Sequence, residues 1–197
     1  DECVRADITA TDLANLPAAF AELGDAGADF IQLQKFPELR AIEHVHTAGN
    51  SPAMCDAAAL ILIGDRAFGQ ALGIAPRARL VASAAASGEP LEVVGGCITA
   101  VEALLADQKI TAKAIDLFEI HEAFAATVVK TRLVLGLDNS RLNVNGGVIA
   151  LGHPMGATGA IMAGTLIDEL YRQQLKNGIV AASGAAGSGS AIMLEHC

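Results

Sequence analysis

Residues 143–159 read Asn143-Val144-Asn145-Gly146-Gly147-Val148-Ile149-Ala150-Leu151-Gly152-His153-Pro154-Met155-Gly156-Ala157-Thr158-Gly159. Pro154 fixes its own φ and pushes His153 towards extended geometry, so this histidine lies on a glycine-lined turn just before a helix that we expect to begin near Met155. The positive end of such a helix disfavours the imidazolium ion and keeps the histidine neutral. A neutral imidazole can take a proton from a thiol or donate a hydrogen bond to an oxyanion. The stretch therefore predicts an active-site histidine; the alternative is a tight turn around a buried, hydrogen-bonded histidine.

A second histidine, His121, ends an apolar strand in the segment Phe118-Glu119-Ile120-His121-Glu122-Ala123-Phe124-Ala125-Ala126. Ligands of open α/β sheets collect beyond the carboxyl ends of the strands, so His121 is well placed for catalysis. Capping of the helix that follows is an alternative role for this residue. Glu122 is expected to point into the first turn of that helix, where a carboxylate complements the helix dipole.

A third segment, residues 181–192, has the pattern of a strand, a turn of small residues and another strand. A turn with so few side chains lets a ligand contact backbone amides. Considered alone, the segment is better explained as a plain glycine-rich hairpin. The two histidine segments are what favour a ligand site here.

The composition predicts a soluble globular chain. With 52% hydrophobic and 18% charged residues among 197, the chain can bury a sizeable core. No apolar run is long enough to span a bilayer, so we expect no membrane span. The net charge of -9, with no Trp and one Tyr, argues against nucleic-acid binding. The four cysteines lack metal-ligand or disulfide spacing, which predicts free thiols in a reducing cytoplasm: they are Cys3, Cys55, Cys97 and Cys197.

Short apolar strands alternate with helices along most of the chain, which predicts a sheet covered on both faces. We expect strands at residues 79–85, 115–120, 142–144, 178–182 and 190–195, and helices at residues 65–72, 99–107, 123–135 and 155–174. The apolar run at residues 56–64 is expected to be a buried segment.

The first 46 residues carry mixed signals. We expect a strand near residues 3–8, a helix capped by Thr11 or Asp12 that runs through Ala21, and a loop at residues 24–40. Two histidines share one face of Glu43-His44-Val45-His46, where a surface strand is favoured over a metal site. The chain opens at Asp1 without a methionine or a targeting segment, which predicts a piece of a longer protein.

Together these segments resemble the C-terminal half of the thiolase family, nearly without gaps from Thr47 to Glu195. His121-Glu122-Ala123-Phe124 is similar to the family's Asn-or-His-Glu-Ala-Phe motif, in the histidine form found among fatty-acid oxidation thiolases related to the trifunctional enzyme. The match extends to the Gly-His-Pro motif at residues 145–159, the glycine-rich strand turn at residues 183–191 and the segment that opens the domain at residues 47–51. Three ordered motifs at the family spacing make this resemblance specific.

The resemblance implies a layered α/β/α/β/α fold made of two similar halves. Residues 47–197 would form the C-terminal half, and residues 1–46 would be a remnant of a loop or insert region. It also implies thiolytic cleavage of a 3-oxoacyl-CoA by CoA, or the reverse Claisen condensation, in fatty-acid β-oxidation. A nucleophilic cysteine attacks the keto carbon and is acylated before CoA releases the acyl group. None of the four cysteines lies in the family's nucleophile motif, so we expect the nucleophile on an N-terminal half, in the same polypeptide or another chain.

By this resemblance, His153 activates the nucleophile, and His121 with His153 binds the oxyanion. Ser183 occupies the position of the second catalytic cysteine, which shuttles the substrate's α-proton. A hydroxyl is a far weaker acid than a thiol, whose pKa is about 8.5, so proton transfer would be impaired or rerouted. The residues expected to contact acyl-CoA are Ser51, Pro52, Phe124, Gly152, Gly184 and Ala185. Neither a metal nor a tightly bound cofactor is expected, and coenzyme A is a substrate.

Other departures from the family pattern predict altered pantetheine contacts and a reshaped pocket mouth. Pro52 replaces a serine near the pantetheine, and Ala57 replaces a glycine. Residues 96–99 replace a Gly-Pro-rich turn, and residues 24–45 are longer than the family stretch. Cys97 is not expected to be a nucleophile, because nothing near it in sequence supplies a base.

Two functions therefore remain open. The first is an acyltransferase of the degradative thiolase type. The second is a catalytically degenerate thiolase-like subunit that binds acyl-CoA or supports a partner, which Ser183 favours. By analogy with the family we expect a homodimer or tetramer.

Overall fold

Four strands form one mixed sheet in this computed structural model, which describes residues 4–197. The strands lie in the order β1-β4-β3-β2. Their bounds are β1 (Ala78–Ser87), β2 (Leu117–Ile120), β3 (Asn177–Ser183) and β4 (Ser188–His196). Strand β4 pairs antiparallel with β1 and β3, whereas β2 pairs parallel with β3. The parallel pair needs a long crossover connection, and the helices between β2 and β3 provide it.

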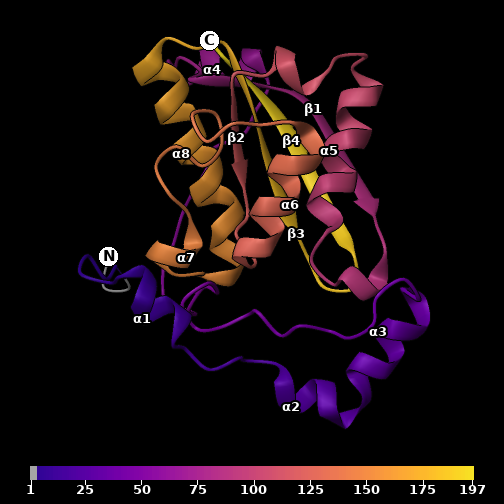
Figure 1. Cartoon of the computed structure of the whole chain (residues 1–197). Coiled ribbons are helices and arrows are strands. Elements are labelled where there is room, and N and C mark those ends of the chain that lie inside the picture. The colour runs from indigo at the N-terminus through magenta and orange to yellow at the C-terminus, as the bar shows by residue number, and fades with distance from the viewer. Residues whose placement is uncertain (1–3) are drawn as a thin grey trace.

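Helices cover both faces of the sheet (Figure 1). Helices α5 (Gly96–Asp107) and α6 (Ala125–Leu135) cover one face, and α8 (Thr158–Gln173) covers the other. Side chains alternate along β2, so Phe118 and Ile120 pack on the α5 side while Leu117 packs against α8. The prediction of a sheet covered on both faces is confirmed. The described residues form three layers, with helices on each side of one sheet. Three α/β/α layers are what one half of the expected α/β/α/β/α fold would contribute.

Helix α5 begins in direct contact with β4 because both backbones lack side chains at that point. A Cβ atom at Gly96 would lie 2.2 Å from the Ser188 carbonyl oxygen, and one at Gly189 would lie 2.0 Å from the Gly96 oxygen. Only glycine fits at these two positions without moving the backbone. As a result, the Cys97 N–H reaches the end of β3 and donates a hydrogen bond to Ser183 Oγ at 2.9 Å.

Residues 4–65 lie outside the sheet. They contain α1 (Ala10–Ala14), α2 (Ala21–Leu23), a π-helical turn (Gly24–Ala28) and α3 (Asp29–Lys35), and α4 (Arg66–Ala71) follows them. Figure 1 shows α1 to α3 as an arm beneath the end of the sheet where α7 (Val148–Leu151) lies, opposite the C-terminus. Lys35 Nζ forms an ion pair with Glu89 at 2.9 Å, and the Ala125 N–H donates to the Asn50 oxygen at 3.0 Å. These contacts hold the arm against the sheet domain.

Several predictions for this N-terminal part were wrong. Residues 4–8 form no strand, and Cys3 lies outside the described residues. The first helix ends at Ala14, not Ala21, and Thr9 rather than Thr11 caps it, in a capping box with Asp12. The loop expected at residues 24–40 contains α3. Gly24 and Gly27 lie in the π-helical turn that precedes α3, and these glycines interrupt the helical pattern of the sequence.

The buried segment expected at residues 56–64 was also wrong. These residues are irregular, and Leu60 is 95% and Ile63 75% exposed. Their apolar pattern predicts burial, but no described residues cover this side of the segment. An exposed apolar run of this kind marks a contact surface.

The predictions beyond residue 64 are largely confirmed. Asp65 caps α4, and Gly73, with φ 66°, follows its end. The strand expected at residues 142–144 is only an isolated bridge between Leu142 and Phe118. The helix expected from Met155 begins as a 3-10 turn and becomes α8 at Thr158. In residues 4–197, no helix is both long and apolar enough to cross a membrane.

Candidate active site

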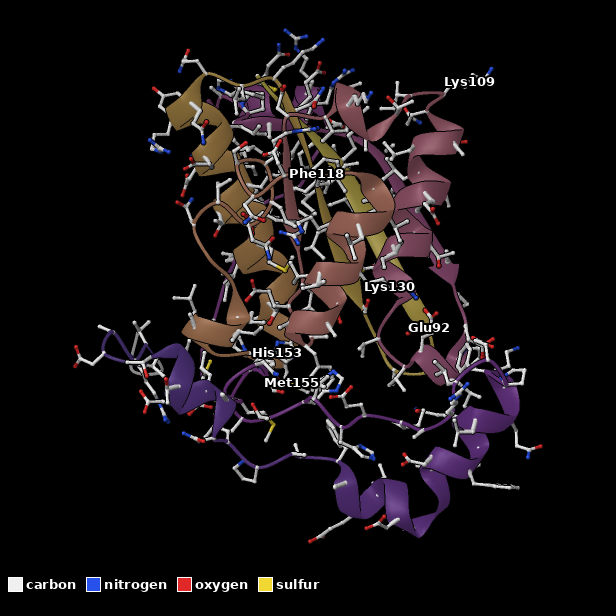
Figure 2. The ribbon with its side chains drawn as sticks, viewed as in Figure 1. Glu92, Lys109, Phe118, Lys130, His153 and Met155 are labelled. Carbon is white, nitrogen blue, oxygen red and sulfur yellow. The ribbon has the colours of Figure 1, made fainter. Side chains whose placement is uncertain are left out.

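His153 lies on the turn between α7 and α8 and is fixed by its backbone. Its N–H donates to the Ala53 oxygen at 2.7 Å, and its carbonyl accepts from the Cys55 N–H at 3.4 Å. The ring Nδ1 is 2.7 Å from Thr158 Oγ1, at the first residue of α8. Gly152 has φ 94°, which L side chains rarely adopt, so glycine permits the sharp turn. Figure 2 shows His153 at the end of the sheet domain that faces the N-terminal arm.

His121 continues the line of β2, and its N–H donates to the Ala181 oxygen at 2.9 Å. Its ring lies against the ring of His153, with the centroids 4.5 Å apart and the planes inclined by 41°. The His121 side chain is 6% exposed, and neither ring nitrogen has a hydrogen-bond partner within residues 4–197. A buried polar group without a partner costs about 1–3 kcal/mol, so this ring is retained at a cost in stability.

Both imidazoles are neutral at neutral pH. Burial lowers the pKa of His121 to about 4, and the neighbouring His153 contributes to the shift. The Ser183 carbonyl beside the ring opposes this shift in pKa but makes no hydrogen bond of good geometry. Burial also lowers the pKa of His153. The sequence predicts a neutral His153 from the positive end of a helix; the direction agrees, but the cause in the structure is burial.

Glu122 holds the turn that carries His153. Its carboxylate accepts hydrogen bonds from the Ile149 N–H at 3.0 Å and from Asn143 Nδ2 at 3.1 Å. The Asn143 side chain also bonds the N–H and carbonyl of Ile120, at 2.7 and 2.9 Å. The expectation that Glu122 points into the first turn of α6 was wrong, because this carboxylate binds the start of α7 instead. Glu122 and Asn143 therefore tie the end of β2 to the His153 turn.

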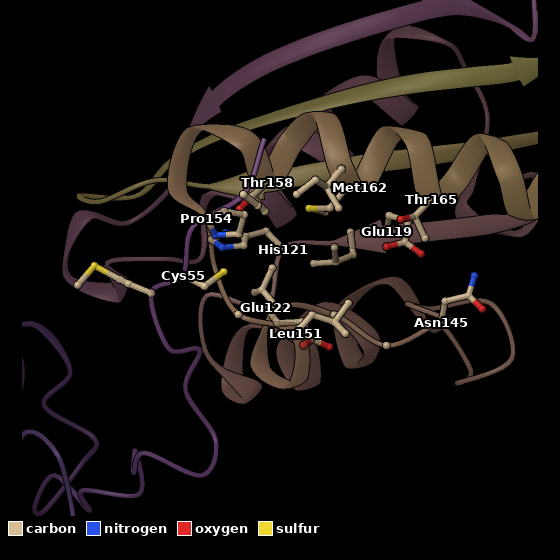
Figure 3. A pocket seen from close by; sticks show the side chains of 18 of the residues that line it. Cys55, Glu119, His121, Glu122, Asn145, Leu151, Pro154, Thr158, Met162 and Thr165 are labelled. Atoms are coloured by element: carbon tan, nitrogen blue, oxygen red, sulfur yellow. The ribbon is translucent and has the colours of Figure 1, made fainter. Parts of the chain in front are cut away.

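A cavity of about 730 Å³ opens beside His121 (Figure 3), and Gly152 and Pro154, the neighbours of His153 in sequence, also line it. It lies between the end of β2, the residue 145–152 loop, α8 and the segment at residues 54–57. Its lining includes Cys55, Glu119, His121, Glu122, Gly152 and Met162. Within residues 4–197, no three His, Cys, Asp or Glu side chains lie close enough to hold a metal ion. The site therefore offers acid–base groups, a thiol and an apolar wall.

Of the predicted site residues, His121 and Gly152 line this cavity, whereas His153 and the others do not. The Ser183 hydroxyl is bonded to the α5 N-terminus, and Gly184 and Ala185 are exposed in the β3–β4 turn. Ser51 and Pro52 are half-buried in the segment that precedes the cavity wall. Phe124 precedes α6 and packs edge-on against His46, with the ring centroids 4.6 Å apart.

A protein-family model identifies the family of this chain. The model of the thiolase C-terminal domain matches residues 74–196. This chain belongs to the thiolase family. A 3-ketoacyl-CoA thiolase of Bacillus subtilis (strain 168) is 36% identical over 100% of this chain and 45% of the relative. An acetyl-CoA acetyltransferase of Synechocystis sp. is 35% identical over 100% of this chain and 44% of the relative.

Solved thiolase structures share the fold. The Bacillus anthracis acetyl-CoA acetyltransferase superposes with a TM-score of 0.82 at 33% identity, covering 98% of this chain and 44% of that one. Human mitochondrial 3-ketoacyl-CoA thiolase in complex with CoA gives 0.81 at 27% identity, covering 100% and 45%. The chain thus spans just under half the length of the thiolases it matches, and the fold predicted for a thiolase C-terminal half is confirmed.

Sequence reasoning missed Glu119 and Cys55 as site residues. Glu119 is 5% exposed, lines the cavity, and makes no hydrogen bond or ion pair with the described residues. The signal was available, because Glu119 is the one charge in the apolar strand β2 and shares a strand face with His121. Cys55 gave no such signal. Its place beside His153 follows from backbone pairing that the sequence does not reveal.

Glu119→Gln is expected to change how stability depends on pH. Burial, followed by the charges of Glu122 and Glu169, raises the pKa of Glu119 to about 8. Between pH 4.5 and 8 the unfolded chain releases this proton while the folded chain keeps it, so the wild type loses stability as pH rises. The variant lacks this loss. Its unfolding free energy should gain about 3 kcal/mol over the wild type between pH 5 and pH 8.

Denaturant unfolding at several pH values measures this difference. Glu102→Gln, at an exposed position of α5, is the matched control and should run parallel to the wild type. Parallel curves for Glu119→Gln as well would show that the Glu119 carboxyl ionises freely in the folded protein.

Proposed function

We propose that this chain forms the acid–base half of a thiolase that cleaves a 3-oxoacyl-CoA with CoA, or runs the reverse Claisen condensation. The observation that carries the proposal is the pair of neutral imidazoles, 4.5 Å apart, at one end of the sheet beside a cavity. Acyl transfer through a cysteine needs a base for the thiol and prepositioned donors for the oxyanion. Two neutral histidines supply both.

In this proposal His153 takes the proton of the nucleophilic cysteine, which lies outside this chain. Thr158 holds the His153 ring in one orientation through its Nδ1 contact, which leaves Nε2 for the thiol. The neutral His121 ring donates an N–H to the oxyanion formed when the thiolate attacks the keto carbon. Its missing hydrogen-bond partner is consistent with a donor reserved for the substrate.

The acyl-CoA would lie along the edge of the cavity. We propose contacts from Ser51, Pro52, Phe124, Gly152, Gly184 and Ala185. The small residues of the β3–β4 turn support this placement, because a turn without bulky side chains lets a pantetheine chain approach backbone amides. Coenzyme A acts here as a substrate, with no tightly bound cofactor.

An N-terminal thiolase half would complete the site, in the same polypeptide or in another chain. The exposed apolar segment at residues 56–64 supports such a partner, since Leu60 and Ile63 are left largely uncovered. In this arrangement residues 47–197 are the C-terminal domain and residues 1–46 are the remnant of a loop region. We further propose a cytoplasmic homodimer or tetramer that acts in fatty-acid β-oxidation. The widely spaced cysteines support the reducing compartment, and size-exclusion chromatography tests the assembly.

A degenerate thiolase-like subunit is the second candidate, and Ser183 favours it. A serine replaces the family's proton-shuttling cysteine, and its hydroxyl is bonded to the Cys97 N–H. Such a subunit would bind acyl-CoA without completing thiolysis.

One experiment separates the two functions. The full-length protein, with this chain joined to its N-terminal half, is mixed with acetoacetyl-CoA and longer 3-oxoacyl-CoAs in the presence of CoA. Thiolysis of any chain length supports the enzyme. CoA binding without thiolysis and without acylation of the nucleophile would assign the chain to the second function.

Ser183→Cys is expected to leave the rate of thiolysis unchanged, because the side chain at position 183 is held on the α5 side of the sheet by the Cys97 N–H and does not line the cavity. The rate of thiolysis at saturating CoA measures this. Ser183→Ala is the matched variant without a proton to transfer, and it should also keep the wild-type rate. A gain of about tenfold in Ser183→Cys alone would instead show that position 183 reaches the reacting atoms, as a thiol gives up a proton far more readily than a hydroxyl.

A further inference from the structure

Thiolase chemistry needs a group that moves the substrate's α-proton, and position 183 lacks the thiol for it. The Ser183 hydroxyl is also turned to the other side of the sheet, where the start of α5 holds it through the Cys97 N–H. Ser183 is absent from the lining of the cavity that His121 lines. If the proposed function holds, another group must carry this proton.

Cys55 is the one described cysteine that lines this cavity. Its backbone is fixed beside the catalytic pair, because residue 54 forms a parallel bridge with His153 and the Cys55 N–H donates to the His153 oxygen. Figure 3 shows the Cys55 side chain extending towards His121 from the segment at residues 54–57. The other described thiols lie elsewhere: Cys97 is fully buried against Thr131, and Cys197 ends the chain at the opposite end of the sheet.

The cavity itself shows signs of a built site. His121 and Glu119 both line it, both are more than nine-tenths buried, and neither His121 ring nitrogen has a hydrogen-bond partner among residues 4–197. Buried polar groups without partners are retained where a ligand or a reaction uses them. The Cys55 thiol therefore lines the same cavity as these buried groups, whereas the other described thiols do not.

We propose that Cys55 is a catalytic residue that carries the substrate's α-proton, in place of the cysteine that is absent at position 183. This inference rests on the proposed function. In thiolysis, the bond between the keto carbon and the α-carbon breaks, and its electron pair moves to the α-carbon of the departing acyl-CoA. The Cys55 S–H gives its proton to that carbon and becomes a thiolate. The incoming CoA thiol returns a proton to Cys55, and the CoA thiolate attacks the acyl-enzyme. The nucleophilic cysteine leaves the acyl group as a thiolate and takes back the proton held by His153.

The test uses the full-length protein with acetyl-CoA in D₂O. Acetylation of the nucleophile, followed by mass spectrometry, needs His153 but no α-proton transfer. Exchange of the acetyl hydrogens of free acetyl-CoA for deuterium needs the α-proton carrier. We expect Cys55→Ala to keep acetylation while exchange falls by about 100-fold. Cys197→Ala, which removes an exposed thiol at the chain's end, is the control and should exchange as the wild type does.

A double variant makes the assignment specific. Cys55→Ala/Ser183→Cys should not regain exchange, because the side chain at position 183 is held on the α5 side of the sheet and does not line the cavity. Wild-type exchange in Cys55→Ala would overturn the proposal, and so would exchange regained in Cys55→Ala/Ser183→Cys. If Cys55→Ala also loses acetylation, the same two measurements are made on Cys55→Ser. Loss of both acetylation and exchange in Cys55→Ser would mean that Cys55 supports the structure, and it would overturn the proposal. A wild type that is never acetylated would instead overturn the proposed function, and this inference with it.

Discussion

His153→Ala should abolish acylation of the nucleophilic cysteine in the full-length protein. We expect acetylation by acetyl-CoA, and kcat/KM for thiolysis, to fall by about 1,000-fold. This corresponds to about 4 kcal/mol of transition-state stabilisation. The reason is the loss of the group that, in the proposed function, takes the thiol proton, since His153 is neutral through burial and its Nδ1 is already engaged by Thr158. Single-turnover acetylation, read by mass spectrometry, measures the effect.

The fold should survive this substitution. The backbone of residue 153 keeps its hydrogen bonds to the segment at residues 53–55, and Glu122 still holds the turn through the Ile149 N–H. His196→Ala, at the opposite end of the sheet, is the matched control and should acetylate normally. Unchanged acetylation in His153→Ala would remove His153 from the role of base and leave the nucleophile without an activating group in this chain.

The motif segments were predictable because each is local. Pro154 and the glycines before it set the His153 turn within a few residues, and the alternation of β2 sets the direction of His121. The sequence does not specify how close the His153 turn and the end of β2 lie in the folded protein. The 4.5 Å contact of the two rings depends on Glu122 and Asn143, which join the end of β2 to the His153 turn. Glu122 was assigned to the wrong helix because helix-dipole arguments consider only the nearest helix.

The N-terminal part was less predictable because its structure depends on partners outside the local sequence. Residues 56–64 have the apolar pattern of a buried strand, and nothing in the pattern says which surface covers it. The arm around α3 is held by single contacts, such as the ion pair between Lys35 and Glu89 and the His44–Asp29 contact at 3.0 Å. Such contacts follow from the tertiary arrangement and leave no periodicity in the sequence.

His121→Ala should lower kcat for thiolysis by about 100- to 1,000-fold with little change in KM. Removing one oxyanion donor costs about that much, and an interaction made only in the transition state affects kcat rather than substrate binding. His121→Asn is the matched variant, because an amide N–H can still donate and the family motif takes Asn or His at this position. Its kcat should stay within about tenfold of the wild type. Steady-state kinetics on both variants checks the pair.

Replacing His121 should lower kcat but raise stability at acid pH. This difference separates a catalytic role of His121 from a structural one. The pKa of His121 is about 4 in the folded protein, below the ordinary value of 6.5. As pH falls from 6.5 towards 4, His121 binds a proton in the unfolded chain but not in the folded chain. The free energy of unfolding of the wild type therefore falls by up to about 3 kcal/mol. Replacing His121 removes this loss, and the Asn variant should therefore be relatively more stable at pH 5 than at pH 7.5. A variant that lost both activity and acid stability would mean that His121 supports the fold rather than the oxyanion.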